Sequence, residues 1–143
     1  MKPNAVITIS GTQQLLDGTS ETIELVTQGR YVYEPGLSEL SYVETQMTGQ
    51  EGVVTTLRVE GDVVTLTRTG KLRSEMRLEL GKPGDSLYDA GFGALLMRVC
   101  ARRITVLLNE HGGILDLEYD IEIEHTGCGT NFLHIEVRKN PAP

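Results

Sequence analysis

The chain is poor in the large aromatic residues that supply much of the volume of many protein cores. Its 143 residues include no Trp, two Phe and five Tyr, so the core has to be built from Val, Ile, Leu and Met. Proline is scarce as well, and there is no low-complexity tract. With 39% apolar and 23% charged residues, the composition predicts a folded domain rather than a disordered chain.

Cysteines and long apolar segments are also lacking. Cys100 and Cys128 do not make a disulfide framework, and a chain of this length can hold a core without one. The N-terminal sequence MKPNAVITIS has no apolar segment typical of a signal peptide, and no stretch approaches the ~18 apolar residues of a membrane span. We therefore expect a cytoplasmic protein without a membrane partner, folded as a single domain over residues 1–143 with an ordered core at about 5–138.

Basic residues are outnumbered by acidic ones. Thirteen Lys and Arg against twenty Asp and Glu give a formal charge of −7 and a pI near 4.9. Phosphate neutralisation supplies most non-specific affinity for nucleic acid, and an acidic surface is repelled by it. We therefore expect no nucleic-acid partner.

What the chain does contain is alternation of apolar and polar residues with a period of two. This alternation is typical of antiparallel strands with one buried face. It is clearest over 115–124, where the outward positions are all acidic. In the segment 21–34, Gly29 interrupts the row of inward-facing side chains, which predicts a bulge or bend there. The expected strands are 5–10, 21–34, 38–47, 53–60, 63–69, 73–80, 115–124 and a last one around 133–137, preceded by a turn at 127–131.

The segment 86–109 permits two interpretations. Helical spacing relates Leu95, Leu96, Val99, Cys100 and Arg103, whereas strand alternation relates Leu95, Met97, Val99 and Ala101. We favour a strand, because one helix among many short strands would need its own place to pack. Cys100 is then expected to be a small core residue.

Short connections between the strands predict an antiparallel meander. About nine strands, each with one apolar face, can bury those faces in a closed barrel or in a two-sheet sandwich. The meander order favours the barrel, which also removes sheet edges. An interior of this size is either filled by side chains or holds one small ligand.

Several motifs occur in an order that resembles a known family. They are Tyr42-x-Glu44-Thr45, Met47-x-Gly49, Arg68-x-Gly70, Met76, Tyr88, Gly93 and Leu117-x-Tyr119. The order resembles the bacterial YwiB-like family of unknown function, small intracellular proteins with a calycin-like β-barrel. The resemblance implies an all-β fold, a single up-and-down barrel of about 8–10 strands with little or no helix, related in shape to lipocalins and fatty-acid-binding proteins. It also implies that 86–108 is mainly extended. It implies no activity, and the Gly-x-Trp signature of lipocalins is absent because the chain has no Trp.

Two charged residues, Glu44 and Arg68, share the face of otherwise buried positions. If both point into one barrel, Arg68 with Tyr42 and Tyr88 could hold the carboxylate or phosphate of a ligand. The alternatives are an interior ion pair between Arg68 and Glu44 with no ligand, and strand ends at which both groups reach water. Val43, Thr45 and Met47 offer a rival inward face, which would turn Glu44 outward.

No cofactor or metal is expected. His125, Cys128 and His134 lack the spacing of paired metal ligands, and His134 is expected to face outward. Three functions remain. The first is a non-enzymatic binder of a small, partly apolar or anionic molecule. The alternatives are a protein-interaction or assembly module with a filled barrel, such as a homodimer, and an enzyme with Glu44 as general base.

Overall fold

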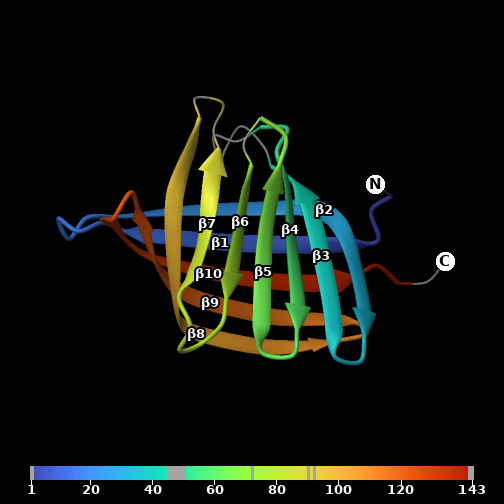
Figure 1. Ribbon diagram of the computed structural model, residues 1–143. Helices are drawn as coiled ribbons and strands as arrows, with labels where there is room; N and C mark the ends of the chain where they lie inside the picture. Colours follow the sequence, from blue (N-terminus) through green and yellow to red (C-terminus); the bar gives the residue numbers. More distant parts are fainter. Residues whose placement is uncertain (1, 45–50, 72, 90, 92, 142–143) are drawn as a thin grey trace.

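The computed structural model describes residues 2–44, 51–71, 73–89, 91 and 93–141. Over these residues the chain forms ten strands and no helix (Figure 1). The all-β prediction is thus confirmed. The strands are β1 (Ala5–Gln14), β2 (Ser20–Glu34), β3 (Leu37–Val43), β4 (Val54–Glu60), β5 (Val63–Thr69), β6 (Ser74–Leu78), β7 (Gly84–Asp89), β8 (Ala94–Asn109), β9 (Gly112–Ile123) and β10 (Thr126–Lys139).

The sheet is a meander that closes on itself. Each strand pairs antiparallel with the next along the chain, and β1 also pairs with β10 over its whole length. The exception is β6 and β7, which are joined by an isolated bridge between Arg73 and Asp89 instead of a ladder. The structure is therefore a nearly closed up-and-down barrel, as the meander order predicted, and not a sandwich.

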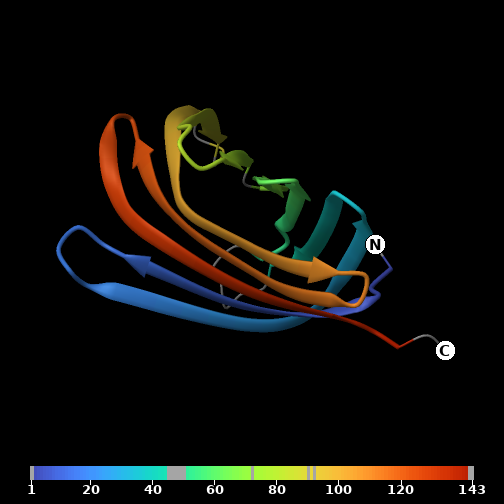
Figure 2. The same ribbon diagram turned by 90° about the horizontal axis from the view of Figure 1, so that it is seen from below.

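Two halves of the barrel cross at a steep angle. In Figure 1, β3 to β6 run almost vertically in front of β1, β9 and β10, which run across the view. Figure 2 shows how the strands curve around the interior. Barrels of this kind turn their corners at bulges or glycines, and here β2 and β8 make the turns.

Gly29 is the corner of β2. The strand pairs with β1 up to Gly29 and with β3 from Arg30 onward. A Cβ atom at Gly29 would overlap the Ile7 side chain and the Ser41 carbonyl oxygen, so only glycine fits this close approach. The bend predicted at Gly29 is confirmed.

Strand β8 settles the ambiguous segment in favour of an extended chain. Met97 and Val99 are buried in the core, as the alternation predicted. A register shift between Ala101 and Arg103 then inserts an extra residue, and the inward positions change to Ile104, Val106 and Leu108. Cys100, expected in the core, is half-buried on the opposite face from Met97 and Val99, and that prediction was wrong.

The predicted turn at 127–131 was also wrong. The turn consists of Glu124 and His125, and the glycine-rich segment is part of β10. A register shift between Gly127 and Gly129 leaves Cys128 as a bulge, and a Cβ at Gly129 would overlap the Gln14 carbonyl oxygen. These glycines allow close strand approach rather than chain reversal.

The interior is layered along the barrel axis. Across β3 to β6, one inward row is made of Leu40, Leu57, Leu66 and Met76, all of them buried. Tyr31 of β2 is paired with Leu40 in the same row, and its hydroxyl donates to the Asn109 carbonyl oxygen at 2.7 Å, which ties β2 to the end of β8. Side chains therefore fill this part of the barrel. The described residues include no helix with the length and apolarity needed to cross a bilayer.

Candidate functional site

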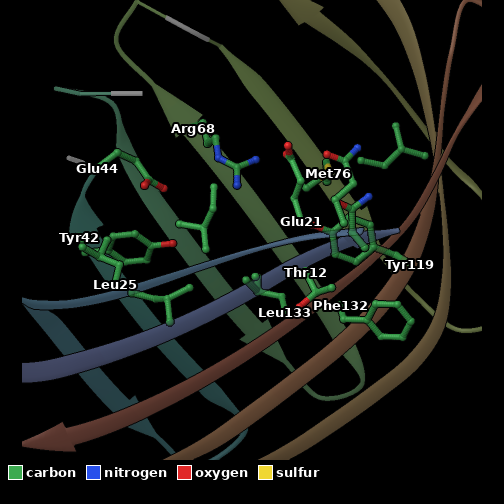
Figure 3. Close-up of a pocket in the computed structure, with 16 residues that line it drawn as sticks. Thr12, Glu21, Leu25, Tyr42, Glu44, Arg68, Met76, Tyr119, Phe132 and Leu133 are labelled. Atoms are coloured by element: carbon green, nitrogen blue, oxygen red, sulfur yellow. The ribbon is translucent and has the colours of Figure 1, made fainter. Parts of the chain in front are cut away.

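The other part of the interior is hollow. A cavity of about 280 Å³ lies beyond the leucine row, toward the end of the barrel where β3 and β5 finish (Figure 3). Its apolar wall includes Ile9, Leu25, Met76, Ile121 and Leu133. The volume corresponds to roughly nine water molecules at ~30 Å³ each, so the cavity has room for a small ligand.

A polar row crosses four neighbouring strands at the level of the cavity. The ladder pairs Tyr42 with Thr55, Thr55 with Arg68, and Arg68 with Ser74. Because paired residues in antiparallel strands point to the same side of the sheet, all four side chains face the interior. Tyr42, Thr55 and Ser74 are buried and Arg68 is half-buried. The fold thus places one cation among buried hydroxyl groups.

Glu44 follows directly after β3 and points into the same space. Its backbone N–H donates to the Val53 carbonyl oxygen at 2.8 Å, which continues the strand pairing by one residue. The residue is 5% exposed, and the Thr55 hydroxyl donates to its Oε1 atom at 2.7 Å. The predicted inward orientation of Glu44 is confirmed. Of the rival inward positions, Val43 is exposed, and Thr45 and Met47 lie outside the described residues.

Arg68 and Glu44 do not form the ion pair that the sequence offered as an alternative. Among the described residues, no contact of 4 Å or less joins the two charged groups. Instead, the Arg68 Nε atom is buried and has no hydrogen-bond partner among the residues that the structure describes. Buried N–H groups are rarely left without an acceptor, so this atom marks a place where an acceptor is missing.

Asn131 lies in the opposite wall and has the same deficit. It lines the cavity from β10, paired with Tyr119 of β9 and Gln13 of β1. Its Nδ2 atom is buried, and no described residue forms a hydrogen bond with it. Two unsatisfied donors, one of them cationic, therefore line one cavity, a combination that suits an anion.

Two phenols complete the polar lining. Burial raises the pKa of Tyr42 far above its ordinary value, the nearby Glu44 carboxylate raises it further, and the Arg68 cation partly opposes both. Burial likewise raises the pKa of Tyr119, and Arg68 again acts in the opposite direction. Both phenols are therefore neutral at physiological pH and able to donate a hydrogen bond. Figure 3 shows the Arg68 side chain extending between Tyr42 and Tyr119.

Tyr88, the fourth residue of the predicted site, is not brought to the cavity. It is half-buried on β7, packed against the core and paired with Leu95. Sequence reasoning also missed Thr55, Ser74 and Asn131. The signal was available in the alternation, because Asn131 shares parity with Leu133 and Ile135, and Thr55 with Leu57.

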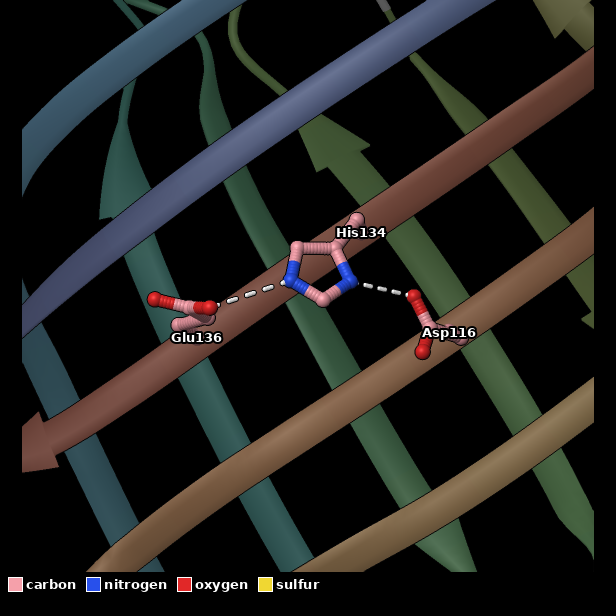
Figure 4. Close-up of polar contacts among 3 residues, drawn as sticks. All are labelled: Asp116, His134 and Glu136. Carbon is pink, nitrogen blue, oxygen red and sulfur yellow. Dashed lines mark hydrogen bonds and ion pairs between the residues drawn. The ribbon is translucent and has the colours of Figure 1, made fainter.

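The three residues weighed as metal ligands are apart from the cavity. His134 lies on the outer face of β10, where its ring nitrogens contact Asp116 and Glu136 (Figure 4). His125 belongs to the β9–β10 turn, and Cys128 forms the bulge in β10. No group of three His, Cys, Asp or Glu side chains within the described part of the chain is arranged to hold a metal ion.

Comparison with known proteins finds a family, a relative and a solved structure that are similar to this chain. A family model described as "Domain of unknown function (DUF1934)" matches residues 7–135. Over 118 residues the chain is 30% identical to the "Uncharacterized beta-barrel protein YwiB" of Bacillus subtilis (strain 168), with 82% of this chain and 80% of that protein covered. The crystal structure of the ywiB protein from Bacillus subtilis superposes with a TM-score of 0.83 at 22% identity, covering 97% of this chain and 93% of that one.

Proposed function

This chain belongs to the DUF1934 family of unknown function, and we propose that its partly hollow barrel binds a small, partly apolar molecule with an acid group. Membership of the family confirms the resemblance found in the motifs, but it supplies no activity. The observation that carries the proposal is the pair of buried donors without acceptors, Arg68 Nε and Asn131 Nδ2, in the walls of one cavity. An acid group on the ligand would accept from both.

The cavity also favours a binder over the alternatives. A module that acts only through its outer face would have no need of a hollow interior, and a filled barrel would be the more stable choice. An enzyme with Glu44 as general base would need a substrate proton within hydrogen-bond reach, and Glu44 at present accepts from Thr55. We therefore propose binding without chemistry.

The same proposal includes the setting of the protein. The net charge of −7 and the acidic outward row of β9 oppose contact with nucleic acid and with anionic bilayers. We expect the binder to act in the cytoplasm on a small molecule. A homodimer would be compatible with this role, because the cavity is built within one chain.

Octanoate tests the proposal against octanol, which has the same apolar chain without the charge. We expect octanoate to raise the melting temperature in a concentration-dependent way and octanol to have a much smaller effect. At a free concentration of a hundred times Kd, binding stabilises the folded state by about 2.7 kcal/mol, or roughly 5–10 °C for a chain of this size. The measurement is thermal unfolding, with native mass spectrometry for stoichiometry.

Gly11 provides a variant that blocks the cavity without removing a polar group. Gly11 lines the cavity on β1, and a Cβ atom there would meet only Leu133 Cδ1 at 3.8 Å. Gly11→Leu should extend into the empty space and abolish the octanoate shift. Ser10→Leu adds a larger side chain to the same strand on the outer face and should leave the shift unchanged. An equal shift in Gly11→Leu, or no shift in the wild type with either probe, would overturn the proposal.

A further inference from the structure

Glu44 gives the cavity a second buried charge that the acid group of a ligand does not explain. Its carboxylate is almost fully buried and lies beside the Tyr42 ring in Figure 3. The hydrogen bond that the described residues give its side chain comes from Thr55. A buried carboxylate is stable when a cation or several donors face it. Within the described part of the chain, that single hydroxyl group uses only part of the accepting capacity of the carboxylate.

The fold keeps the two charges near each other but separate. Glu44 extends β3 and Arg68 lies on β5, with β4 between them and an offset of two residues along the strands, so their backbones are about 12 Å apart. Both influence the Tyr42 phenol, Glu44 raising its pKa and Arg68 lowering it, yet they are not in contact with each other. The empty volume lies in front of both side chains.

The polar groups are sorted by hydrogen-bonding type. Arg68, Asn131 and the neutral phenols of Tyr42 and Tyr119 can donate, whereas the Glu44 carboxylate only accepts. A ligand that satisfies the whole set has an acceptor toward the donors and a donor toward Glu44. Its remaining surface has to be apolar, to match the aliphatic part of the wall.

We propose, on the basis of the function proposed above, that the ligand is a small zwitterion with an apolar body. Its carboxylate is held by Arg68 and Asn131, and its ammonium group is held by Glu44. The charge balance gives the selectivity. A zwitterion preserves the balance between the two inward charges, Arg68 and Glu44, whereas a simple anion adds a second negative charge near Glu44 and a simple amine adds a second positive charge near Arg68. Glu21 also lines the cavity, but it is exposed to solvent, which screens its charge.

Four six- or five-carbon probes separate these cases. Norleucine and 6-aminohexanoate are isomeric zwitterions with different charge separations. Hexanoate lacks the ammonium group, and pentylamine lacks the carboxylate. Affinities are measured by NMR titration of the backbone amides of Gly11 and Glu44 and the Nε–H signal of Arg68. We expect one of the zwitterions to bind at least tenfold more tightly than hexanoate and pentylamine.

The variant Glu44→Gln should reduce or reverse the preference for a zwitterion over hexanoate. Loss of the carboxylate should weaken the better zwitterion at least tenfold and should strengthen hexanoate, because the repulsion between two carboxylates disappears. Glu39→Gln is the matched control, since it makes the same change on the outer face of β3, where Glu39 contacts Arg58. It should change neither affinity. If Glu44→Gln fails to fold, the ratio of zwitterion to hexanoate affinity in the wild type still decides the question.

The outcomes distinguish the two proposals. If hexanoate binds as tightly as both zwitterions, or if Glu44→Gln weakens hexanoate, the zwitterion assignment is wrong and the anion-binding function stands. If none of the four probes binds and octanoate also fails to bind, the binding function itself is wrong. Binding of pentylamine alone would contradict both proposals, because it would place the ligand on Glu44 without Arg68.

Discussion

His134 is a titratable side chain on the outer face with two acidic partners. Its Nδ1 atom contacts Asp116 on the neighbouring strand β9, and its Nε2 atom lies 3.2 Å from Glu136 Oε1 (Figure 4). The hydrogen bond with Asp116 and then that with Glu136 raise the pKa of His134 above its ordinary value. Protonation of this imidazole therefore favours the folded state.

The pH dependence of stability follows from that direction. The stabilisation is complete below the unfolded pKa of about 6.5 and is lost as the pH rises through the higher folded pKa. Because the His134 side chain is 43% exposed, solvent screening limits the effect to about 0.2–1 kcal/mol. Urea unfolding at pH 5.5 and 8.5 should show this difference for the wild type and a smaller one for His134→Gln.

An exposed histidine is the control for this measurement. His111 also lies beside an acid, Glu110, but both side chains are largely exposed. His111→Gln should keep the wild-type pH dependence. A pH dependence that is identical in His134→Gln and the wild type would show that the cluster does not couple protonation to folding.

Individual site residues could be predicted from the sequence where a charged residue occupies an inward-facing position of a strand. Glu44 and Arg68 stood out because charged side chains among inward positions are unusual. Asn131 and Thr55 did not stand out, because small uncharged polar residues are common on both faces of strands. The missing ion pair could not be predicted, because it depends on the register of β3, β4 and β5, which places Glu44 and Arg68 on non-adjacent strands at different levels.

Individual strands could be predicted where one face of the strand is apolar. Strand boundaries were predicted wrongly where glycines inside a strand were taken as a turn. β9 and the first half of β8 followed the alternation. β1 was expected to end at residue 10, yet it continues to Gln14, because pairing with β2 on one side and β10 on the other extends a polar segment. Turn propensity favoured the glycines of β10 over Glu124 and His125, which have no turn signature.

The β9–β10 turn stores strain that a substitution can release. Glu124 and His125 have φ angles of 52° and 66°, as both central residues of a two-residue hairpin turn of this hand require. A residue with a Cβ pays about 1 kcal/mol or more for this region, and glycine does not. His125→Gly should therefore raise the free energy of unfolding by about 0.5–1 kcal/mol, with a melting temperature higher by about 1–4 °C.

The β8–β9 turn provides the comparison. His111 lies there with an ordinary negative φ, so His111→Gly gains nothing in the folded state and increases the entropy of the unfolded chain. We expect it to lower the melting temperature slightly. Calorimetry of both variants decides the matter, and a fall in stability for His125→Gly would show that its side chain matters more than its backbone. Glu124 is kept, because its carboxylate accepts from the Leu96 N–H at 2.9 Å.

At the scale of the whole molecule, the barrel is closed unevenly. The pairing of β1 with β10 runs the length of β1, whereas β6 and β7 are joined at one end by the Arg73–Asp89 bridge. The strand order made a closed meander predictable. The open seam was not, because β6 and β7 follow each other along the chain and would ordinarily pair. Gly84, where a Cβ would press on the Arg77 carbonyl oxygen, shows how tightly the chain is drawn together near the β6–β7 connection.

Hydrogen exchange can detect this seam residue by residue. The Arg73 and Asp89 N–H groups donate to each other's carbonyl oxygens, at 2.8 and 2.9 Å, so these amides point across the seam. By the period of two, the amides of Glu75 and Arg77 also point into it, whereas that of Met76 points toward β5. We therefore expect Glu75 and Arg77 to exchange much faster than Met76. Since slow exchange requires a hydrogen bond protected from opening, equal protection of all three amides would mean that β6 and β7 form a full ladder in solution and that the barrel has no seam.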